Sequence, residues 1–227
     1  MMFSLSKRLE AVAVLIPNGA FLADVGSDHA YLPIALMERG AIRGAIAIDN
    51  KKAPYERMRQ NVKKAGLEGK ISCSLSDGIE SIGPEVDTIA LCGIGGLLTL
   101  RILSTNPDKL AHVDAIVLDP HADQALVRKR LSEMGFHLDE ECMVEDQGIY
   151  YSLMRWRHGA PRTPYTGREL KFGPILLKKK SKDFLAYLSH MKKEDEKILA
   201  EAKNLPSKNH DSLEKEICFI DSYISDI

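Results

Sequence analysis

Five short apolar segments, separated by stretches with helical periodicity, constrain the fold of this chain more than any other feature. They are A-F-L-A-D at 20–24, A-I-A-I-D at 45–49, I-S-C-S-L-S at 71–76, T-I-A-L-C at 88–92 and A-I-V-L-D at 115–119. Continuous apolar runs of this length are typical of parallel strands that are buried on both faces. The pattern therefore predicts an α/β fold whose mainly parallel sheet is covered by helices on each side.

Two longer segments follow, F-H-L-D-E-E-C-M-V-E at 136–145 and I-Y-Y-S-L-M-R-W at 149–156, and a short D-Q-G connection joins them. Their composition and spacing predict an antiparallel hairpin at the edge of the sheet. Together with the five parallel strands, the hairpin predicts a first domain over residues 1–160.

The remaining chain, residues 161–227, has a different pattern. Pro161, Pro164 and Gly167 interrupt the strand rhythm and predict a linker. Apolar residues then recur at helical spacing in two runs, with a turn expected around Pro206 between them. The runs are Phe184, Leu188, Met191 and Ile198, then Leu213, Ile217, Ile220 and Ile224. This spacing predicts two antiparallel helices packed as a short coiled coil.

Charge is distributed unevenly, although the formal net charge is only −1. Nine basic residues and one acid lie between positions 155 and 182, a segment that we call the basic collar. A basic segment beside an acidic domain is typical of a protein that binds a polyanion along one edge. A linker exposed to solvent is an equally good interpretation of the same segment. The candidate RNA contacts are Arg155, Arg157, Lys178, Lys179, Lys180 and Lys182.

Several classes of site and location are not expected. The four cysteines lie far apart, and no two histidines have the H-x-x-x-H spacing, so we expect no metal site and a reducing environment. The apolar run at 11–16 is too short for a signal peptide or a membrane span. The sequence therefore predicts a cytoplasmic protein without a membrane partner. We also expect a monomer or a weak dimer.

The first strand leads into L-A-D-V-G-S-D-H-A-Y-L-P, which places Asp24 at its carboxyl end and Gly26 in the following turn. Open α/β sheets bind ligands at the carboxyl ends of their strands. Gly26 would let the backbone approach a nucleoside-like ligand, and Asp24 or Asp28 would pair with a cationic amino group. Asp28 and His29 can also be read as helix-capping residues.

Polar or glycine residues also end the next three strands. Asp49, followed by Asn50, is suited to accept the two hydroxyls of a ribose. Asp77 and Gly78 can receive an adenine amine, although an unliganded turn uses the same pair. The fourth strand ends at Cys92 and Gly93, which are expected to line the reaction centre.

Other nucleotide-binding and hydrolytic motifs are missing. The turn after the first strand lacks G-x-G-x-x-G, and the chain contains neither a P-loop nor a G-x-S-x-G elbow. Two alternatives remain open at this point. One is an NAD(P)-dependent oxidoreductase, favoured by Asp49 and the G-I-G-G string, and the other is a non-catalytic RNA-binding protein, favoured by the basic collar.

S-K-R-L-E, D-V-G-S-D-H-A-Y-L-P, C-G-I-G-G and F-G-P-I-L-L-K together closely resemble the bacterial TrmK family of tRNA methyltransferases. The similarity runs over nearly the whole chain. It implies a Rossmann-like class I methyltransferase domain followed by a coiled coil, S-adenosylmethionine as the cofactor, and methylation of N1 of adenine 22 in tRNA. Carried over residue by residue, it assigns the cofactor site to Asp24, Gly26, Asp28, Asp49, Asp77, Gly78 and Gly93, with Asn50 and Cys92 beside them.

The implied reaction needs no strong base, because adenine N1 already has a lone pair. Its product is cationic, so a carboxylate near the base would stabilise the developing charge. We expect Asp28 to have this role, while Tyr31 or His29 positions the base by stacking or hydrogen bonding.

Overall fold

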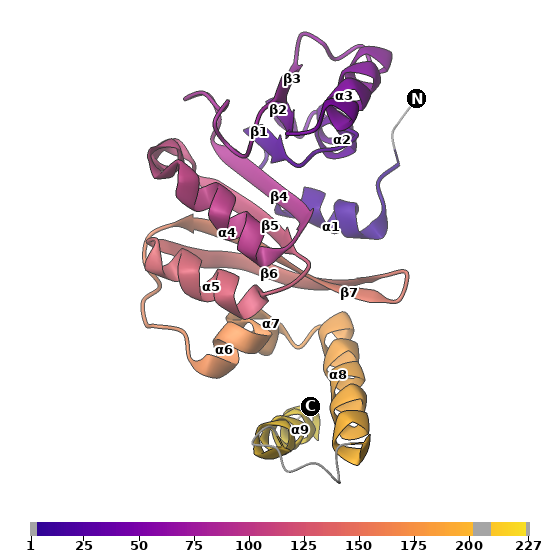
Figure 1. The fold of residues 1–227 in the computed structure, drawn as a ribbon, viewed down its shortest axis with the longest axis vertical. Coiled ribbons are helices and arrows are strands. Elements are labelled where there is room, and N and C mark those ends of the chain that lie inside the picture. Colours follow the sequence, from indigo (N-terminus) through magenta and orange to yellow (C-terminus); the bar gives the residue numbers. More distant parts are fainter. Residues whose placement is uncertain (1–3, 202–209, 226–227) are drawn as a thin grey trace. The chain divides into compact units, whose positions relative to one another are not determined.

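The computed structural model describes residues 4–201 and 210–225 (Figure 1), so the turn predicted around Pro206 lies outside the described residues. In chain order the elements are α1 (Lys7–Leu15), β1 (Ala20–Val25), α2 (Tyr31–Glu38), β2 (Ile42–Asp49), α3 (Lys52–Lys64), β3 (Ile71–Leu75), β4 (Thr88–Ile94), α4 (Gly96–Thr105), the 3-10 helix η1 (Pro107–His112), β5 (Ala115–Pro120), α5 (Gln124–Glu133), β6 (Phe136–Asp146), β7 (Ile149–His158), α6 (Gly167–Phe172), α7 (Pro174–Lys179), α8 (Lys182–Glu201) and α9 (His210–Ser225).

Seven strands of the described residues form one sheet in the order β3-β2-β1-β4-β5-β7-β6. Strands β1 to β5 are parallel, whereas β7 runs antiparallel to both β5 and β6. This topology confirms the predicted Rossmann-like α/β fold with its closing hairpin. The strand order changes direction between β1 and β4, and such a switch point opens a ligand crevice at the carboxyl ends of the strands.

Alternate residues of the strands pack into two separate cores, one on each face of the sheet. Leu22 and Val117 belong to a core formed with α1, α2 and α3, whereas their neighbours Ala23 and Ile116 belong to one formed with α4 and α5. Figure 1 shows α4 and α5 covering one face. Because both faces are buried, the strand sequences are continuously apolar, as their pattern predicts.

The first helix, α1, is fixed at its start and along one side. The Ser6 side chain accepts a hydrogen bond from the Leu9 N–H at 3.2 Å and caps the helix. Arg39, at the end of α2, donates from Nη1 and Nη2 to the two carboxylate oxygens of Glu10, at 2.7 and 2.6 Å. These contacts fix the start of α1 and attach the helix to the end of α2.

The segment predicted to be a linker contains two short helices, α6 and α7. Thr166 and Glu169 form a capping box at the start of α6, and Gly173, with a φ of +94°, separates it from α7, which begins at Pro174. The sequence does not predict these helices, because the prolines and glycines around them are also typical of loops.

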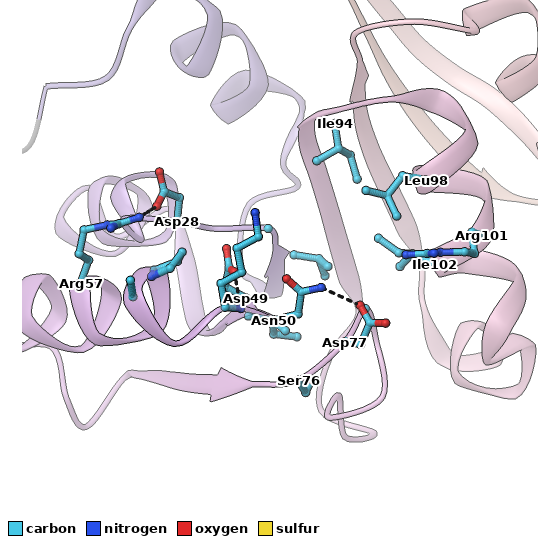
Figure 2. Close-up of a pocket in the computed structure, with 17 residues that line it drawn as sticks. Asp28, Asp49, Asn50, Arg57, Ser76, Asp77, Ile94, Leu98, Arg101 and Ile102 are labelled. Carbon is cyan, nitrogen blue, oxygen red and sulfur yellow. Dashed lines mark hydrogen bonds and ion pairs between the residues drawn. The ribbon is translucent and has the colours of Figure 1, made fainter.

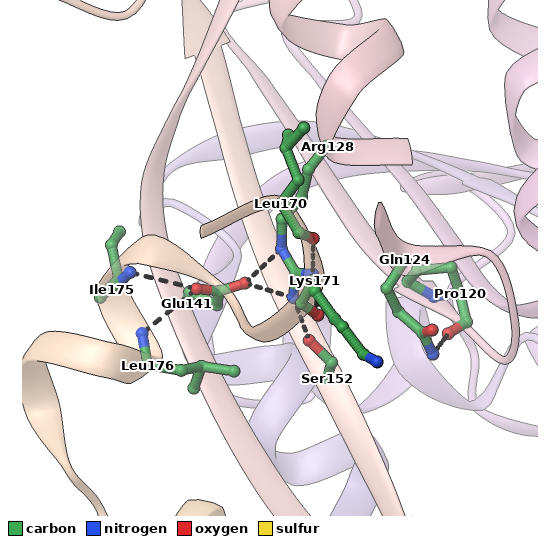
Figure 3. Close-up of polar contacts among 9 residues, drawn as sticks. All are labelled: Pro120, Gln124, Arg128, Glu141, Ser152, Leu170, Lys171, Ile175 and Leu176. Carbon is green, nitrogen blue, oxygen red and sulfur yellow. Dashed lines mark hydrogen bonds and ion pairs between the residues drawn. The ribbon is translucent and has the colours of Figure 1, made fainter. Parts of the chain in front are cut away.

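A buried ion pair attaches these helices to the sheet domain (Figure 3). Arg128 of α5 donates to Glu141 of β6 and also to the backbone carbonyls of Leu170 and Lys171, at 2.7 and 3.1 Å. The other oxygen of Glu141 accepts the N–H groups at the start of α7. Residues 161–178 therefore belong to the sheet domain by their contacts.

Contacts divide the chain into two compact units, Met1–Lys178 and Lys179–Ile227. In the second unit α8 and α9 pack against each other, with the rings of Phe184 and Tyr223 in edge contact at 6.3 Å. The two C-terminal helices are thus present, and their winding as a coiled coil stays a prediction. No helix within the described residues is long and apolar enough to cross a membrane.

Candidate functional site

The larger of two adjoining clefts, about 590 Å³ in volume, opens at the carboxyl ends of β1, β2 and β3. Its lining includes many of the residues that the sequence predicts to be in the cofactor site. They are Gly26, Asp28, Asp49, Asn50, Asp77 and Gly78. Loops far apart in the sequence supply them, and the shared edge of the parallel strands brings them together.

The larger cleft has a polar side and an apolar side (Figure 2). On the polar side Asn50 donates to Asp77 at 3.2 Å, and Asp49 accepts the N–H of Lys51 at 2.9 Å. On the other side the end of β4 and the first turns of α4 present Ile94, Leu98 and Ile102, and Arg101 of the same helix also lines the cleft. Hydrogen-bond acceptors opposite an apolar surface suit a nucleoside, which has ribose hydroxyls and a flat aromatic base.

Glycines at two turns allow the backbone to line this cleft closely. Gly26 has a φ of +77°, and the N–H groups of Gly26 and Ser27 donate to the carbonyl of Ile48 at 2.9 and 3.1 Å, which holds the β1 turn against β2. Gly78 has a φ of +62°, and a Cβ at this position would lie 3.1 Å from Cγ2 of Ile102. A side chain at either turn would therefore strain the backbone or crowd the cleft.

The S-D-H-A turn after β1 holds two non-glycine residues, Asp28 and Ala30, in the left-handed region, with φ values of 52° and 58°. Such conformations have a free-energy cost and concentrate at functional sites. The turn directs the Asp28 carboxylate toward Arg57 of α3, with which it pairs, and toward Nε2 of His29 at 3.3 Å. His29 and Tyr31 stack with their ring centroids 4.9 Å apart.

A smaller cleft of about 240 Å³ adjoins the first and shares Gly26 and Asp28 with it. Its other lining residues come from α1, the β1 turn, the start of α2 and the end of β4. They are Arg8, Leu9, Asp24, Ser27, His29, Tyr31, Leu32 and Cys92. Because the two clefts share Gly26 and Asp28, they lie side by side at the carboxyl end of β1.

Burial controls the protonation of the groups around the smaller cleft. Removal from water raises the pKa of Asp24 to about 6, although the hydroxyl of Ser27 donates to this carboxylate and opposes the shift. Burial, with the carboxylates of Asp119 and Asp24, holds the pKa of the Cys92 thiol well above its ordinary value. Cys92 is therefore a neutral wall residue, whereas Asp24 changes charge close to neutral pH.

Arg8 and Asp119 are not among the site residues that the sequence predicts. Arg8, from the first turn of α1, pairs with Asp119 at the end of β5, and its guanidinium carbon lies 5.3 Å from the centroid of the Tyr151 ring. Gly93, predicted to be at the site, lines neither cleft, but a Cβ on it would lie 3.3 Å from Nη1 of Arg8. The sequence places Asp119 near the carboxyl end of its strand, as it places Asp24, but it does not indicate that Arg8 pairs with it.

The candidate RNA contacts differ in how far other groups already engage them. Arg155 and Arg157 of β7 both donate from Nε to the same oxygen of Asp139, at 2.7 and 3.0 Å. Lys178, Lys179 and Lys182 are exposed, and Lys180 lies 4.9 Å from the centroid of the Tyr223 ring. Their contact with RNA stays a prediction. Among the described residues no group of three or more His, Cys, Asp or Glu side chains is arranged to hold a metal ion.

Comparison with known proteins gives consistent matches. A methyltransferase domain family model matches residues 5–154. The tRNA (adenine(22)-N(1))-methyltransferase of Bacillus subtilis (strain 168) is 37% identical over 186 residues, which are 80% of this chain and 78% of the relative.

Among the solved structures that match almost the whole chain are two with a bound ligand. The first is a Streptococcus pneumoniae protein in complex with S-adenosyl-L-methionine, with a TM-score of 0.88, 34% identity and coverage of 97% of this chain and 100% of the other. The second is M. capricolum TrmK in complex with S-adenosyl-homocysteine, with a TM-score of 0.84, 28% identity and 99% coverage of both chains.

Proposed function

This chain belongs to the TrmK family of tRNA (adenine(22)-N(1))-methyltransferases, and we propose that its two adjoining clefts bind the cofactor and present it to the target base. The enzyme uses S-adenosylmethionine to methylate N1 of adenine 22 in tRNA. The observation that carries the assignment of the clefts is that Gly26 and Asp28 line both of them. We propose that one ligand lies in the larger cleft and that its reactive end reaches the smaller one.

The larger cleft fits the adenosyl part of S-adenosylmethionine by its size and its chemistry. We assign the ribose hydroxyls to Asp49 at the end of β2 and the adenine amine to the Asp77–Gly78 turn, which Asn50 helps to order. The apolar wall of Ile94, Leu98 and Ile102 would cover the adenine ring. Asp24 and Gly26 lie where the chain of the methionyl part would continue.

S-adenosylmethionine, when bound, supplies an electrophilic methyl group on a positively charged sulfur. The lone pair of adenine N1 forms the new bond to this carbon while the sulfur keeps the electrons of the bond that breaks, so the positive charge moves to the base. The chain needs to hold the base in line and to stabilise that charge. We assign the second task to the carboxylate of Asp28, which lines both clefts.

The side chains of His29 and Tyr31 form a stacked pair at the smaller cleft, and Tyr31 is 38% exposed. An exposed aromatic ring beside a cleft is a surface on which an unstacked base can lie. The target adenine must leave its stacking partners in the tRNA, which costs a few kcal/mol. We propose that His29 and Tyr31 offset part of this cost by holding the base next to Asp28.

The basic collar is the proposed surface for the tRNA backbone. Because Asp139 offsets part of the charge of Arg155 and Arg157, we expect the exposed lysines Lys178, Lys179 and Lys182, with Lys180, to contribute most of the attraction. We place the enzyme in the cytoplasm with its substrate and expect a monomer or a weak dimer, which light scattering of the full chain would distinguish.

Label transfer from methyl-labelled S-adenosylmethionine to unmodified tRNA transcripts tests the proposed function. We expect label to enter a transcript with adenine at position 22 and not its matched adenine-to-guanine variant, and nuclease digestion to release N1-methyladenosine. Label that enters both transcripts equally would show that the enzyme methylates another position. Binding of S-adenosylhomocysteine without any label transfer would separate the cofactor assignment from the substrate assignment.

A further inference from the structure

A groove of about 720 Å³ lies between α4 and α5, and the proposed function gives it no role. Figure 1 shows the two helices side by side on one face of the sheet. Each helix contributes residues at helical spacing to the walls of the groove. They include Leu97, Leu100 and Arg101 of α4 and Leu126, Lys129 and Arg130 of α5.

Part of the lining is apolar and open to solvent. Leu97 is 64% exposed and Leu126 is 36% exposed, and each belongs to the first turn of its helix. Because α4 and α5 begin after β4 and β5 end, both leucines lie toward the carboxyl ends of the strands, where the larger cleft opens. Large apolar side chains gathered at a groove with a charged rim are typical of a surface that binds a partner.

The charged part of the lining is basic. Among the described residues it contains Arg101, Lys129 and Arg130 and a single acid, Glu133. Glu133 pairs with Arg130 at 2.9 Å and offsets its charge. Arg101 and Lys129 are exposed, and their side chains form no hydrogen bond or ion pair within residues 4–201 and 210–225. The groove therefore combines two uncompensated cations with apolar side chains, which suits the phosphates and bases of a nucleic acid strand.

Arg101 also lines the larger cleft, so the groove and the proposed cofactor site share a border (Figure 2). The RNA strand that carries the target adenine continues on both sides of it and has to lie against surfaces that border this site. We propose that the α4–α5 groove binds the tRNA strand next to the target nucleotide, with Arg101 and Lys129 at its phosphates and Leu97 and Leu126 against a base. This inference rests on the proposed function, because it concerns the same substrate.

The groove and the cofactor site belong to the same compact unit, Met1–Lys178, whereas Lys179, Lys180 and Lys182 of the basic collar belong to the other. Contacts with phosphates fix the register and the orientation of a nucleic acid without reading its sequence. Phosphates held by α4 and α5 would therefore set the position of the target nucleotide relative to the cofactor. This task differs from the general attraction of tRNA by the lysines of the basic collar.

The double variant Arg101→Ala/Lys129→Ala tests the inference. We expect tRNA binding to weaken roughly tenfold and the slope of log affinity against log salt to fall by up to about two, because two phosphate contacts are lost. Lys129→Ala alone should lower the slope by about one. In label transfer the KM for tRNA should rise, while the dissociation constant of S-adenosylhomocysteine, measured by calorimetry without tRNA, should change by less than about twofold.

Arg59→Ala/Lys64→Ala is the matched control, since it removes one arginine and one lysine that are exposed on α3 and line neither cleft nor the groove. It should keep nearly the full affinity for tRNA, and circular dichroism should show that all variants are folded. If both double variants lose affinity equally, or if Arg101→Ala/Lys129→Ala binds tRNA as the unchanged enzyme does, the inference is wrong. It is also wrong if the affinity for S-adenosylhomocysteine falls as far as the affinity for tRNA, which would assign Arg101 to the cofactor.

Leu126→Asp separates an RNA strand from a second copy of this chain as the occupant of the groove. A carboxylate at this position would repel phosphates and weaken tRNA binding, and light scattering should give the same molar mass as for the unchanged chain. If the substitution instead turns a dimer into a monomer and leaves tRNA binding intact, the groove is an interface between two copies and the inference is wrong. Label transfer by the unchanged enzyme to the transcript with adenine at position 22 tests the proposed function separately, so a failure there is distinguishable from a failure at the groove.

Discussion

Arg128 and Glu141 form an ion pair in which both side chains are almost completely buried, with Nε and Nη2 of the arginine 2.9 and 2.8 Å from the same carboxylate oxygen. The pair lies where α5, β6 and the helices α6 and α7 meet (Figure 3). A buried charge that loses its partner keeps its desolvation cost, so each residue depends on the other.

We therefore expect Glu141→Gln to lower the free energy of unfolding by about 3–5 kcal/mol, because Arg128 would remain buried without a counter-charge. Arg128→Met should have a similar cost, and the double variant should cost clearly less than the sum of the single ones. Urea unfolding measures these values.

Arg130→Met, at an exposed pair with Glu133 on the same helix, is the control and should change the free energy of unfolding by less than about 1 kcal/mol. Additive effects of the single and double variants of Arg128 and Glu141 would show that these two charges act independently.

Cofactor binding should depend on pH through Asp24. The pKa of this carboxyl is about 6 in the free protein because burial disfavours its charged form. Below that pH the neutral acid cannot attract an ammonium, so affinity for S-adenosylhomocysteine should rise as pH increases through about 6 and then level off. Calorimetric titrations between pH 5 and pH 8 would measure the change. Asp24→Asn should bind more weakly at high pH and show a flatter profile, and an unchanged profile in this variant would assign the dependence to another group.

Asp49 should contribute to the affinity for the cofactor through the ribose. Asp49→Ala removes the carboxylate at the end of β2, and the loss of a hydrogen bond to a charged acceptor should weaken binding of S-adenosylhomocysteine roughly tenfold or more. Asp108→Ala, at an exposed position of η1 outside both clefts, is the control and should bind normally. Equal binding by both variants would mean that the ribose lies elsewhere.

Neutralisation of Lys178, Lys179 and Lys180 together should weaken tRNA binding and flatten its dependence on salt. Each phosphate contact that is lost lowers the slope of log affinity against log salt by roughly one, so the slope should fall by up to about three. Filter binding at several salt concentrations measures both quantities. The matched control replaces three other exposed lysines, Lys63 and Lys64 at the end of α3 and Lys70 just before β3. An equal loss in both triple variants would indicate general electrostatic attraction, and no loss in either would remove the basic collar from the RNA surface.

The sheet and the larger cleft could be predicted because their signals are local. A continuous apolar run indicates a strand that is buried on two faces. A polar residue that ends such a run, such as Asp49, then lies at the ligand-binding edge of the sheet. The smaller cleft could be predicted only in part. Arg8 is one arginine in an amphipathic helix, and nothing near it in the sequence indicates that Asp119 and Tyr151 hold its guanidinium.

Two further features are hard to predict for a different reason, because the same sequence pattern is typical of more than one structure. Leu98 and Ile102 have the i, i+4 spacing of an ordinary buried helix face, although they line the larger cleft. The prolines and glycines between 161 and 174 resemble a linker, but Thr166 and Glu169 already have the spacing of a capping box. The attachment of α6 and α7 to the sheet domain depends on Arg128, which is 42 residues away in the sequence from Leu170, whose carbonyl it contacts.

The position of β6 at the end of the strand order also affects how the protein behaves when it is concentrated. An open strand edge can pair with the same edge of another molecule and begin aggregation. β6 carries Asp139, Glu140, Glu145 and Asp146 along its length. If the β6 strands of two molecules paired edge to edge, these acidic side chains would lie close to those of the other molecule. At the other edge, β3 is only five residues long and includes two serines. We therefore expect the acids of β6 to oppose pairing between the sheet edges of two molecules.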